Sequence, residues 1–174
     1  GMEMGSTKAR LPKLRYTLEQ LANVRRFGDC AFSPDGKQVA IVADLDGQMN
    51  LWVLPTTGGF PVQLTFFKEQ SVDDVKWSPV GNQIAFGADY QGNELEQLYL
   101  LDLDGGARPR LLTDRPEKRY HLADWSRDGR FLYYCTDDRD PAALDVARID
   151  VVTGERERLT EEDARLAPER PSPR

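Results

Sequence analysis

The chain has 174 residues, of which 30% are charged and 40% are hydrophobic, a composition typical of a globular domain with one sizeable core. No apolar run approaches the roughly 20 residues that a membrane-spanning helix needs, and the first segment, GMEMGSTKARLPKL, lacks the apolar centre of a secretory signal. The formal net charge of -6 repels phosphate backbones. We therefore expect a cytoplasmic protein that binds neither nucleic acid nor membranes.

The N-terminal residues predict an arm followed by a short helix. Residues 1–15 are expected to be disordered or derived from a tag, because a glycine precedes the first methionine. In residues 16–24, Thr17 can cap a first helical turn with Gln20 three residues on, so we predict a leader helix. Isolated short helices are marginally stable, which leaves a flexible arm as the alternative.

Two short motifs recur with a common period in the rest of the chain. The stretches FSPDG, WSPVG and WSRDG end in glycines 45 and 48 residues apart, at Gly36, Gly81 and Gly129. The dipeptide Leu-Thr recurs 48 and 47 residues apart, at 64–65, 112–113 and 159–160. Two independent markers with one period indicate a structural unit that is used three times.

The segments between these markers are typical of β-strands. The runs KQVAIVAD, NQIAFGAD and RFLYYCTD are rich in β-branched and aromatic residues and are bounded by turn residues. In the first motif, proline presets φ near -65° and glycine accepts a positive φ. Arg127 replaces the proline and Val80 replaces the aspartate, which a turn tolerates and a catalytic motif would not. The motif therefore predicts a hairpin between the first two strands of each unit.

Four short antiparallel strands per 40 to 50 residues are typical of one blade of a β-propeller. We predict an all-β fold of three four-stranded antiparallel blades, spanning residues 25–66, 67–114 and 115–161. The expected strands are 29–33, 37–43, 49–55 and 62–65 in the first blade, 74–78, 83–88, 97–103 and 110–113 in the second, and 122–126, 131–136, 145–151 and 157–160 in the third. Residues 162–174 form a tail rich in proline and charge that does not predict a fourth blade.

The SPDG hairpin and the terminal Leu-Thr resemble the propeller repeats of the TolB-like and prolyl-oligopeptidase groups, over about Tyr16–Thr160. The leader YTLEQLANVRRFGDCAFSPDGKQVAIV is similar to the start of the acylaminoacyl-peptidase-like branch. This resemblance implies a propeller fold and leaves two functions open. One is a non-catalytic interaction or scaffold module. The other is the N-terminal propeller segment of a serine peptidase, gating a hydrolase domain that this chain does not contain.

The sequence offers no constellation of residues for catalysis. The family's peptidases carry their nucleophile in a GxSxG motif, which occurs nowhere in this chain. His121 is the only histidine, and its place at a blade junction predicts a loop or packing residue. We expect no catalytic, cofactor-binding or metal-binding residues, no cofactor, and no enzymatic activity of the chain itself.

Both cysteines align with small or apolar residues of other strands. Cys30 and Cys135 are therefore expected to be buried core thiols. They belong to non-adjacent blades, too far apart for a disulfide, and no CxxC or Cys/His cluster predicts a zinc site.

Three aspartates and one acidic cluster also stand out. Asp44, Asp89 and Asp137 recur where the second strand of each blade ends, and we expect them to cap the following hairpin rather than to bind metal. The cluster Thr136–Pro141, TDDRDP, lacks the ligand spacing of an EF-hand and predicts an exposed loop.

Aromatic residues recur at fixed positions of the blades. Phe32, Trp77 and Trp125 share a position on the first strand, and Trp52 and Tyr99 share one on the third. We expect these side chains to form the core between blades, and a ligand-stacking platform is the alternative.

Three blades would form an open arc whose end sheets expose apolar faces. Two copies would supply six blades, within the roughly four to eight of closed propellers, so we expect a homodimer, with a protein or peptide as a further possible partner. The alternative is that the chain is part of a longer propeller.

Overall fold

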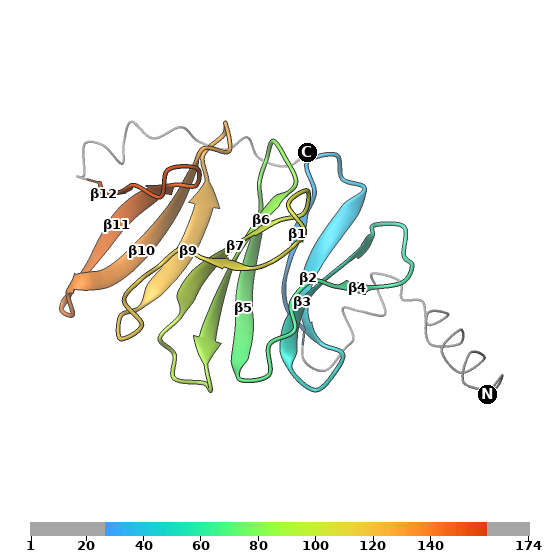
Figure 1. Cartoon of the computed structure of the whole chain (residues 1–174), viewed down its shortest axis with the longest axis horizontal. Helices are drawn as coiled ribbons and strands as arrows, with labels where there is room; N and C mark the ends of the chain where they lie inside the picture. Colours follow the sequence, from blue (N-terminus) through green and yellow to red (C-terminus); the bar gives the residue numbers. More distant parts are fainter. Residues whose placement is uncertain (1–26, 160–174) are drawn as a thin grey trace.

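The computed structural model describes residues 27–159 as three four-stranded antiparallel sheets, each with its strands in sequence order (Figure 1). The expected leader helix at 16–24, the arm at 1–15 and the tail at 162–174 lie outside the described residues. Blade 1 contains β1 (Phe27–Phe32), β2 (Gln38–Asp44), β3 (Met49–Pro55) and β4 (Val62–Gln63). Blade 2 contains β5 (Gln70–Trp77), β6 (Gln83–Tyr90), β7 (Gln97–Asp102) and β8 (Arg110–Leu111). Blade 3 contains β9 (Tyr120–Trp125), β10 (Phe131–Asp140), β11 (Ala143–Asp150) and β12 (Arg156–Arg158).

The three sheets stand side by side in sequence order, with blade 2 in the middle (Figure 1). The first strands β1, β5 and β9 meet across the two boundaries between blades. The predicted all-β fold of three blades is thus confirmed for residues 27–159. Within this range the structure has no helix long and apolar enough to cross a membrane.

The hairpin predicted from the SPDG motif is built around its serine and aspartate. In blade 1, the Ser33 hydroxyl donates to Asp35 Oδ1 at 2.7 Å and accepts the amide of Gln38 at 3.0 Å. Blade 3 repeats this arrangement with Ser126 and Asp128, at 2.6 Å. The glycine that follows has a φ of about 70° in both blades, a backbone conformation that glycine adopts without penalty.

The hairpin of blade 2 differs because Val80 stands where the other two blades have aspartate. The Ser78 hydroxyl accepts the amide of Val80 at 3.3 Å instead of bonding a carboxylate. Gly81 does not adopt a positive φ, so the expectation of a left-handed glycine is wrong for this blade. Without the aspartate, the turn loses the acceptor for the amide two residues later and takes another path.

The recurrent Leu-Thr dipeptide fastens the end of each sheet to its third strand. The leucine amide donates to a carbonyl of that strand at 2.8 Å, in the pairs Leu64–Leu51, Leu112–Leu98 and Leu159–Val146. The Thr65 hydroxyl also accepts the amide of Leu51 at 2.8 Å, and Thr113 repeats this contact with Leu98 at 3.3 Å. β4 and β8 have only two residues each, so these hydrogen bonds help to attach the outer strand to the third strand of the sheet.

The core lies between the blades. Residues of blades 1 and 2 share one buried cluster that includes Val53, Leu64, Trp77 and Phe86, and residues of blades 2 and 3 share another that includes Leu98, Leu100, Trp125 and Tyr134. Trp77 and Trp125 each pack toward the preceding blade, and the Trp125 indole donates to the carbonyl of Lys76 at 2.9 Å. The prediction that these two tryptophans form the core between blades is confirmed.

Phe32 does not follow the two tryptophans, and the expectation that it is buried is wrong. Its side chain is 55% exposed, against 2% for Trp77 and 1% for Trp125. Phe32 occupies the position that faces a preceding blade, and the described residues contain no sheet ahead of β1. Tyr99 is half-buried against the cluster shared by blades 1 and 2, as expected, and stacks on Phe86 with ring centroids 5.1 Å apart. Trp52 packs instead against a cluster of blade 1 residues alone, which is not the core between blades that was expected.

The cysteines are not the buried core thiols that the sequence predicted. Cys30 is exposed, because it shares the face of β1 with Phe32. Cys135 is half-buried. It pairs with His121 just as Val42 pairs with Asp29, but Val42 is covered by blade 2, whereas no sheet among the described residues follows blade 3.

The loop expected at Thr136–Pro141 is also wrong, because β10 continues through Asp140 and pairs there with Ala143. Asp44 and Asp89 accept amides of the hairpins that follow them, at 2.7 Å from Gly47 and 3.2 Å from Glu94, as expected. Asp137 instead accepts the amide of Arg119, which precedes β9. The ladder between β10 and β9 ends at Thr136, so Asp137, the next residue of β10, lies beside the segment that precedes β9.

Two glycines with the same backbone conformation allow packing between blades to be measured. Gly36→Ala places a Cβ in open space and should cost about 1 kcal/mol of unfolding free energy for its positive φ alone. At Gly129 a Cβ would also collide with the Val80 side chain and lie 3.0 Å from Ser78 Oγ, in the turn of blade 2. Gly129→Ala should therefore lower the unfolding free energy by clearly more than Gly36→Ala in urea titrations. Equal losses would contradict this packing of turn against turn.

A candidate carboxylate and histidine site between blades

Three side chains from two blades converge at one end of the boundary between blades 2 and 3. Asp74 lies on β5, Glu96 directly precedes β7, and His121 lies on β9. His121 Nδ1 is 3.6 Å from Glu96 Oε2 and 3.9 Å from Asp74 Oδ2. One ligand atom from each residue lies within 4.8 Å of the other two. We call these three residues the junction cluster.

The register of blade 2 explains why the two carboxylates meet. Asp74 pairs with Gly87 on β6, and Gly87 pairs with Leu98 on β7. Glu96 lies two residues before Leu98, so it points to the same side of the sheet, because alternate residues of an extended strand share a face. The amide of Tyr120 donates to the Glu96 carbonyl at 3.0 Å, which fixes the start of β9 and its neighbour His121 beside both carboxylates.

Gly87 provides the space in which the carboxylates meet. A Cβ at this position would overlap with Glu96 Oε1 and Asp74 Oδ1. The corresponding residues of the other two blades, by strand register, are Val42 and Cys135, whose side chains would fill this space. The cluster therefore depends on a glycine in the middle of a strand, a position where glycine often marks a close approach by another group.

The two carboxylates are buried without enough hydrogen-bond donors. The side chains of Asp74 and Glu96 are 16% and 9% exposed. Asp74 Oδ1 and Glu96 Oε1 have no hydrogen-bond partner among the described residues. Burial, with the Asp74 carboxylate beside it, raises the pKa of Glu96 to about 10. A proton or a cation between the carboxylates would satisfy both oxygens, which otherwise repel each other.

An acidic cavity of about 410 Å³ opens beside the cluster. Four of its lining residues are carboxylates, namely Asp73, Asp89, Glu94 and Glu96. Its remaining lining residues carry no basic group, namely Met49, Ser71, Val72 and Gly92. Burial raises the pKa of Asp73, and the Asp74 charge adds to this effect. A concave surface lined by charges of one sign concentrates counter-ions, so this cavity favours a cationic ligand.

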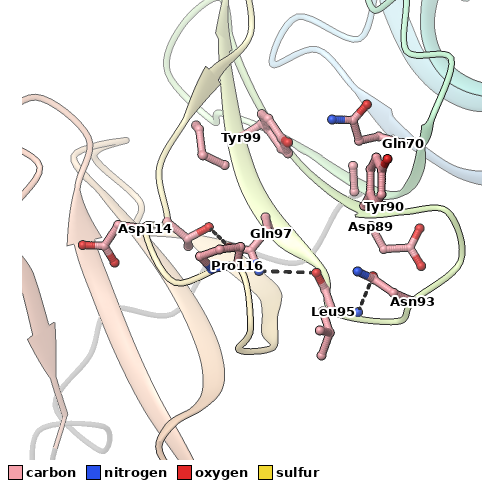
Figure 2. A pocket seen from close by; sticks show the side chains of 12 residues that line it. Gln70, Asp89, Tyr90, Asn93, Leu95, Gln97, Tyr99, Asp114 and Pro116 are labelled. Atoms are coloured by element: carbon pink, nitrogen blue, oxygen red, sulfur yellow. Dashed lines mark hydrogen bonds between the residues drawn. The ribbon is translucent and has the colours of Figure 1, made fainter.

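A second cavity, of about 330 Å³, lies along β7 on the other side of Asp89 (Figure 2). Figure 2 shows hydrogen bonds among some of its polar groups, such as that from Gln97 to the Leu95 carbonyl. The Gln97 amide donates to the carbonyls of Leu95 at 3.3 Å and Lys118 at 2.8 Å, and its oxygen accepts the Thr113 hydroxyl at 2.7 Å. Two of these bonds hold the segment between β8 and β9, which contains Thr113 and Lys118, against the start of β7. The buried carboxylate oxygens without a partner lie in the junction cluster, which is therefore the stronger candidate site.

The sequence placed His121 at a blade junction, and the structure agrees. It is neither a loop nor a packing residue, however, because it lies on β9 with its side chain 64% exposed. The sequence did not identify Asp74 or Glu96 as site residues. The position of Asp74 within the repeat was the available signal, because strand register makes Asp29, Asp74 and His121 equivalent in the three blades. Asp29 Oδ2 accepts the amide of Val75 in the next blade at 3.1 Å, whereas Asp74 Oδ1 finds no such donor.

The chain is similar to known propellers and peptidases. A family model described as the TolB beta propeller domain matches residues 15–173. Among curated proteins, an uncharacterized peptidase, YuxL, of Bacillus subtilis is 32% identical over 69% of this chain and 19% of its own length. Dipeptidyl aminopeptidase BIII of Pseudoxanthomonas mexicana is 29% identical over 78% of this chain and 20% of its own length. The chain thus spans about a fifth of these relatives. A solved TolB structure from Agrobacterium tumefaciens superimposes with a TM-score of 0.63 at 28% identity, covering 76% of this chain and 46% of that chain.

Replacing Glu96 should change how stability depends on pH. A carboxyl with a raised pKa keeps its proton in the folded state after the unfolded state has lost it, so folding stability falls as pH rises above about 4.5 and toward about 10. In metal-free protein, Glu96→Gln removes this titration and should flatten the decline by at most about 1.4 kcal/mol per pH unit. Urea unfolding between about pH 6 and about pH 9 measures the difference.

Glu94→Gln is the matched control, since Glu94 is an exposed carboxylate of the same hairpin. It removes one negative charge without touching the buried pair. If wild-type protein and Glu96→Gln lose stability with pH at the same rate, the raised pKa of Glu96 is wrong.

Proposed function

Because the chain belongs to the TolB β-propeller domain family, we propose that it is a non-catalytic propeller module that works by interaction rather than by chemistry. The observation that carries this proposal is the pair of peptidase relatives, which match the chain over only about a fifth of their own length. We favour the version in which the module accompanies the hydrolase domain of a peptidase and restricts which substrates reach it.

The chemistry of the described residues supports a non-catalytic role. A serine peptidase needs a nucleophile, a base within hydrogen-bond reach, and a group that orients the base. The 174 residues contain no GxSxG motif and one histidine. His121 Nδ1 lies 3.9 Å from Asp74 and 3.6 Å from Glu96, whose carboxyl groups are not the hydroxyl or thiol that a base would activate.

The way the blades are built suits a scaffold. Sheets that pack face to face form a rigid body, while the hairpins at their ends vary without disturbing the core. Here the hairpin between β6 and β7 contributes residues to both cavities, including Asp89, which lines each of them. Substrate selection by such a module would depend on these hairpins and on the acidic cavity.

The purified chain should not hydrolyse peptide or acyl-peptide esters, and a fluorophosphonate probe for active serines should not label it, because no nucleophile and base can be assembled. Assays with several chromogenic peptides test this, with a serine protease as the positive control. Turnover that the probe abolishes would contradict a non-catalytic role.

The peptidase version has a separate test. The reading frame that encodes this chain should also encode a GxSxG motif followed by an aspartate and a histidine, the order used by α/β-hydrolases. The sequence of the gene in the source genome tests this prediction. A reading frame without these residues would contradict the peptidase version, and the proposal would then be an interaction module without a hydrolase domain.

A homodimer of two three-bladed arcs remains a prediction for the chain as given. Exposed apolar side chains at both ends of the arc favour pairing, Phe32 in blade 1 and Val146 in blade 3, at 55% and 40% exposure. Light scattering after size exclusion should then give about twice the chain mass of 19.7 kDa. A monomer across a wide concentration range would contradict it.

A further inference from the structure

We propose that Asp74, Glu96 and His121 form a binding site for a divalent transition-metal ion of the zinc type, at the junction of blades 2 and 3. The site goes beyond the proposed interaction role and does not depend on the presence of a hydrolase domain. It rests on the donor set, on the distances between donors, on the space over Gly87 and on two unsatisfied oxygens.

The donor distances suit a small metal ion. Zinc binds imidazole nitrogen and carboxylate oxygen at about 2.0 to 2.2 Å, and tetrahedral angles then separate neighbouring donors by about 3.4 Å. His121 Nδ1 lies 3.6 Å from Glu96 Oε2 and 3.9 Å from Asp74 Oδ2. The imidazole is 64% exposed, so a small rotation of this side chain closes the remaining few tenths of an ångström.

The carboxyl groups of Asp74 and Glu96 are already gathered, and a cation would take the place of the proton that otherwise lies between them. Glu96 is nine-tenths buried, and its Oε1 and the neighbouring Asp74 Oδ1 have no hydrogen-bond partner among the described residues. Buried charged groups in proteins are normally paired or coordinate a metal. A cation bound by His121 Nδ1, Glu96 Oε2 and Asp74 Oδ2 would neutralise this pair of carboxylates, which the missing side chain of Gly87 allows to meet.

The surroundings of the cluster favour a cation as well. Asp73 and Asp89 lie close enough to Glu96 for their negative charges to act on it. The lining of the adjoining cavity is free of lysine and arginine. The negative potential of these carboxylates raises the local concentration of divalent cations. The exposed side of His121 leaves room for water to complete the coordination.

The imidazole decides the type of metal. Magnesium and calcium prefer sites made of oxygen ligands alone, whereas zinc and its transition-metal neighbours bind mixed nitrogen and oxygen sets. Two carboxylates and one imidazole from the protein, with one position left open, also match the ligand number of open zinc sites. We therefore expect zinc to bind more tightly than magnesium or calcium.

Titration calorimetry of the chelator-treated chain with zinc chloride tests the site. We expect one zinc ion per chain, with a Kd of about 10 µM or tighter, a rise in Tm, and no comparable heat from magnesium. His121 is the only histidine of the chain, so nitrogen-15 spectra contain one imidazole. Zinc should shift the Nδ1 resonance of this ring, which identifies the binding atom directly.

Variants assign the ligands. His121→Gln and Glu96→Gln should each weaken zinc binding at least about tenfold, while Glu155→Gln, an exposed carboxylate in the turn between β11 and β12, should leave it within about twofold. His121 is largely exposed, so its replacement leaves the fold intact, and circular dichroism verifies this. Cys30→Ser combined with Cys135→Ser controls for binding by the two free thiols and should retain the affinity.

Three results would overturn the proposal. The first is the absence of binding up to about 1 mM zinc, which would leave a proton shared by the two carboxylates as the sole partner. The second is zinc binding that His121→Gln does not weaken. The third is zinc binding that disappears with the cysteines, which would place the metal on thiolates instead.

Discussion

Burial of sheet faces between neighbouring blades is the constraint on which the rest of this structure depends. A four-stranded sheet has two faces, and an isolated blade can bury neither of them. In blade 2, Phe86 and Ala88 on β6 join the cluster shared with blade 1, while Ala85 on the same strand joins the cluster shared with blade 3. The strand is apolar on both faces because both are covered. On the outer face of blade 1, which no described sheet covers, Phe32 is exposed, although Val39 and Ile41 on β2 are buried there.

The junction cluster is a departure from that rule. On the face of blade 2 toward blade 3, Ala85 and Leu98 are buried in the shared apolar cluster, and between them Gly87 leaves room for two buried carboxylates. Placing two carboxylates in a buried face lowers the stability of the fold unless a proton, a cation or a hydrogen-bond donor pairs with them. The equivalent Asp29 has an amide of the next blade as its partner, so the repeat itself does not require the arrangement at Asp74. A departure that costs stability within an otherwise regular repeat is the usual mark of a functional position.

The sequence predicted the architecture well because its markers act locally. Serine, aspartate and glycine in the SPDG turn bond to one another within six residues, and the Leu-Thr dipeptide bonds to the adjacent strand, so both recur wherever a blade recurs. The site could not be predicted in the same way. Asp74, Glu96 and His121 are far apart in sequence, and their convergence depends on strand register, on a bulge between Val72 and Asp74, and on the small size of Gly87. The exposure of Cys30 was missed for a related reason, since it depends on which blade is next to β1 and not on the strand itself.

Hydrogen exchange of the whole chain, read strand by strand, tests most directly whether packing between blades holds the fold together. Exchange rates report local stability, which is greatest where both faces of a strand are buried. We expect the amides of β6 to exchange slowly and those of β10 to exchange faster, because one face of β10 has only half-buried side chains such as Tyr133 and Cys135. If β10 were protected as strongly as β6, burial between blades would not be what stabilises this propeller, and the central claim would be wrong.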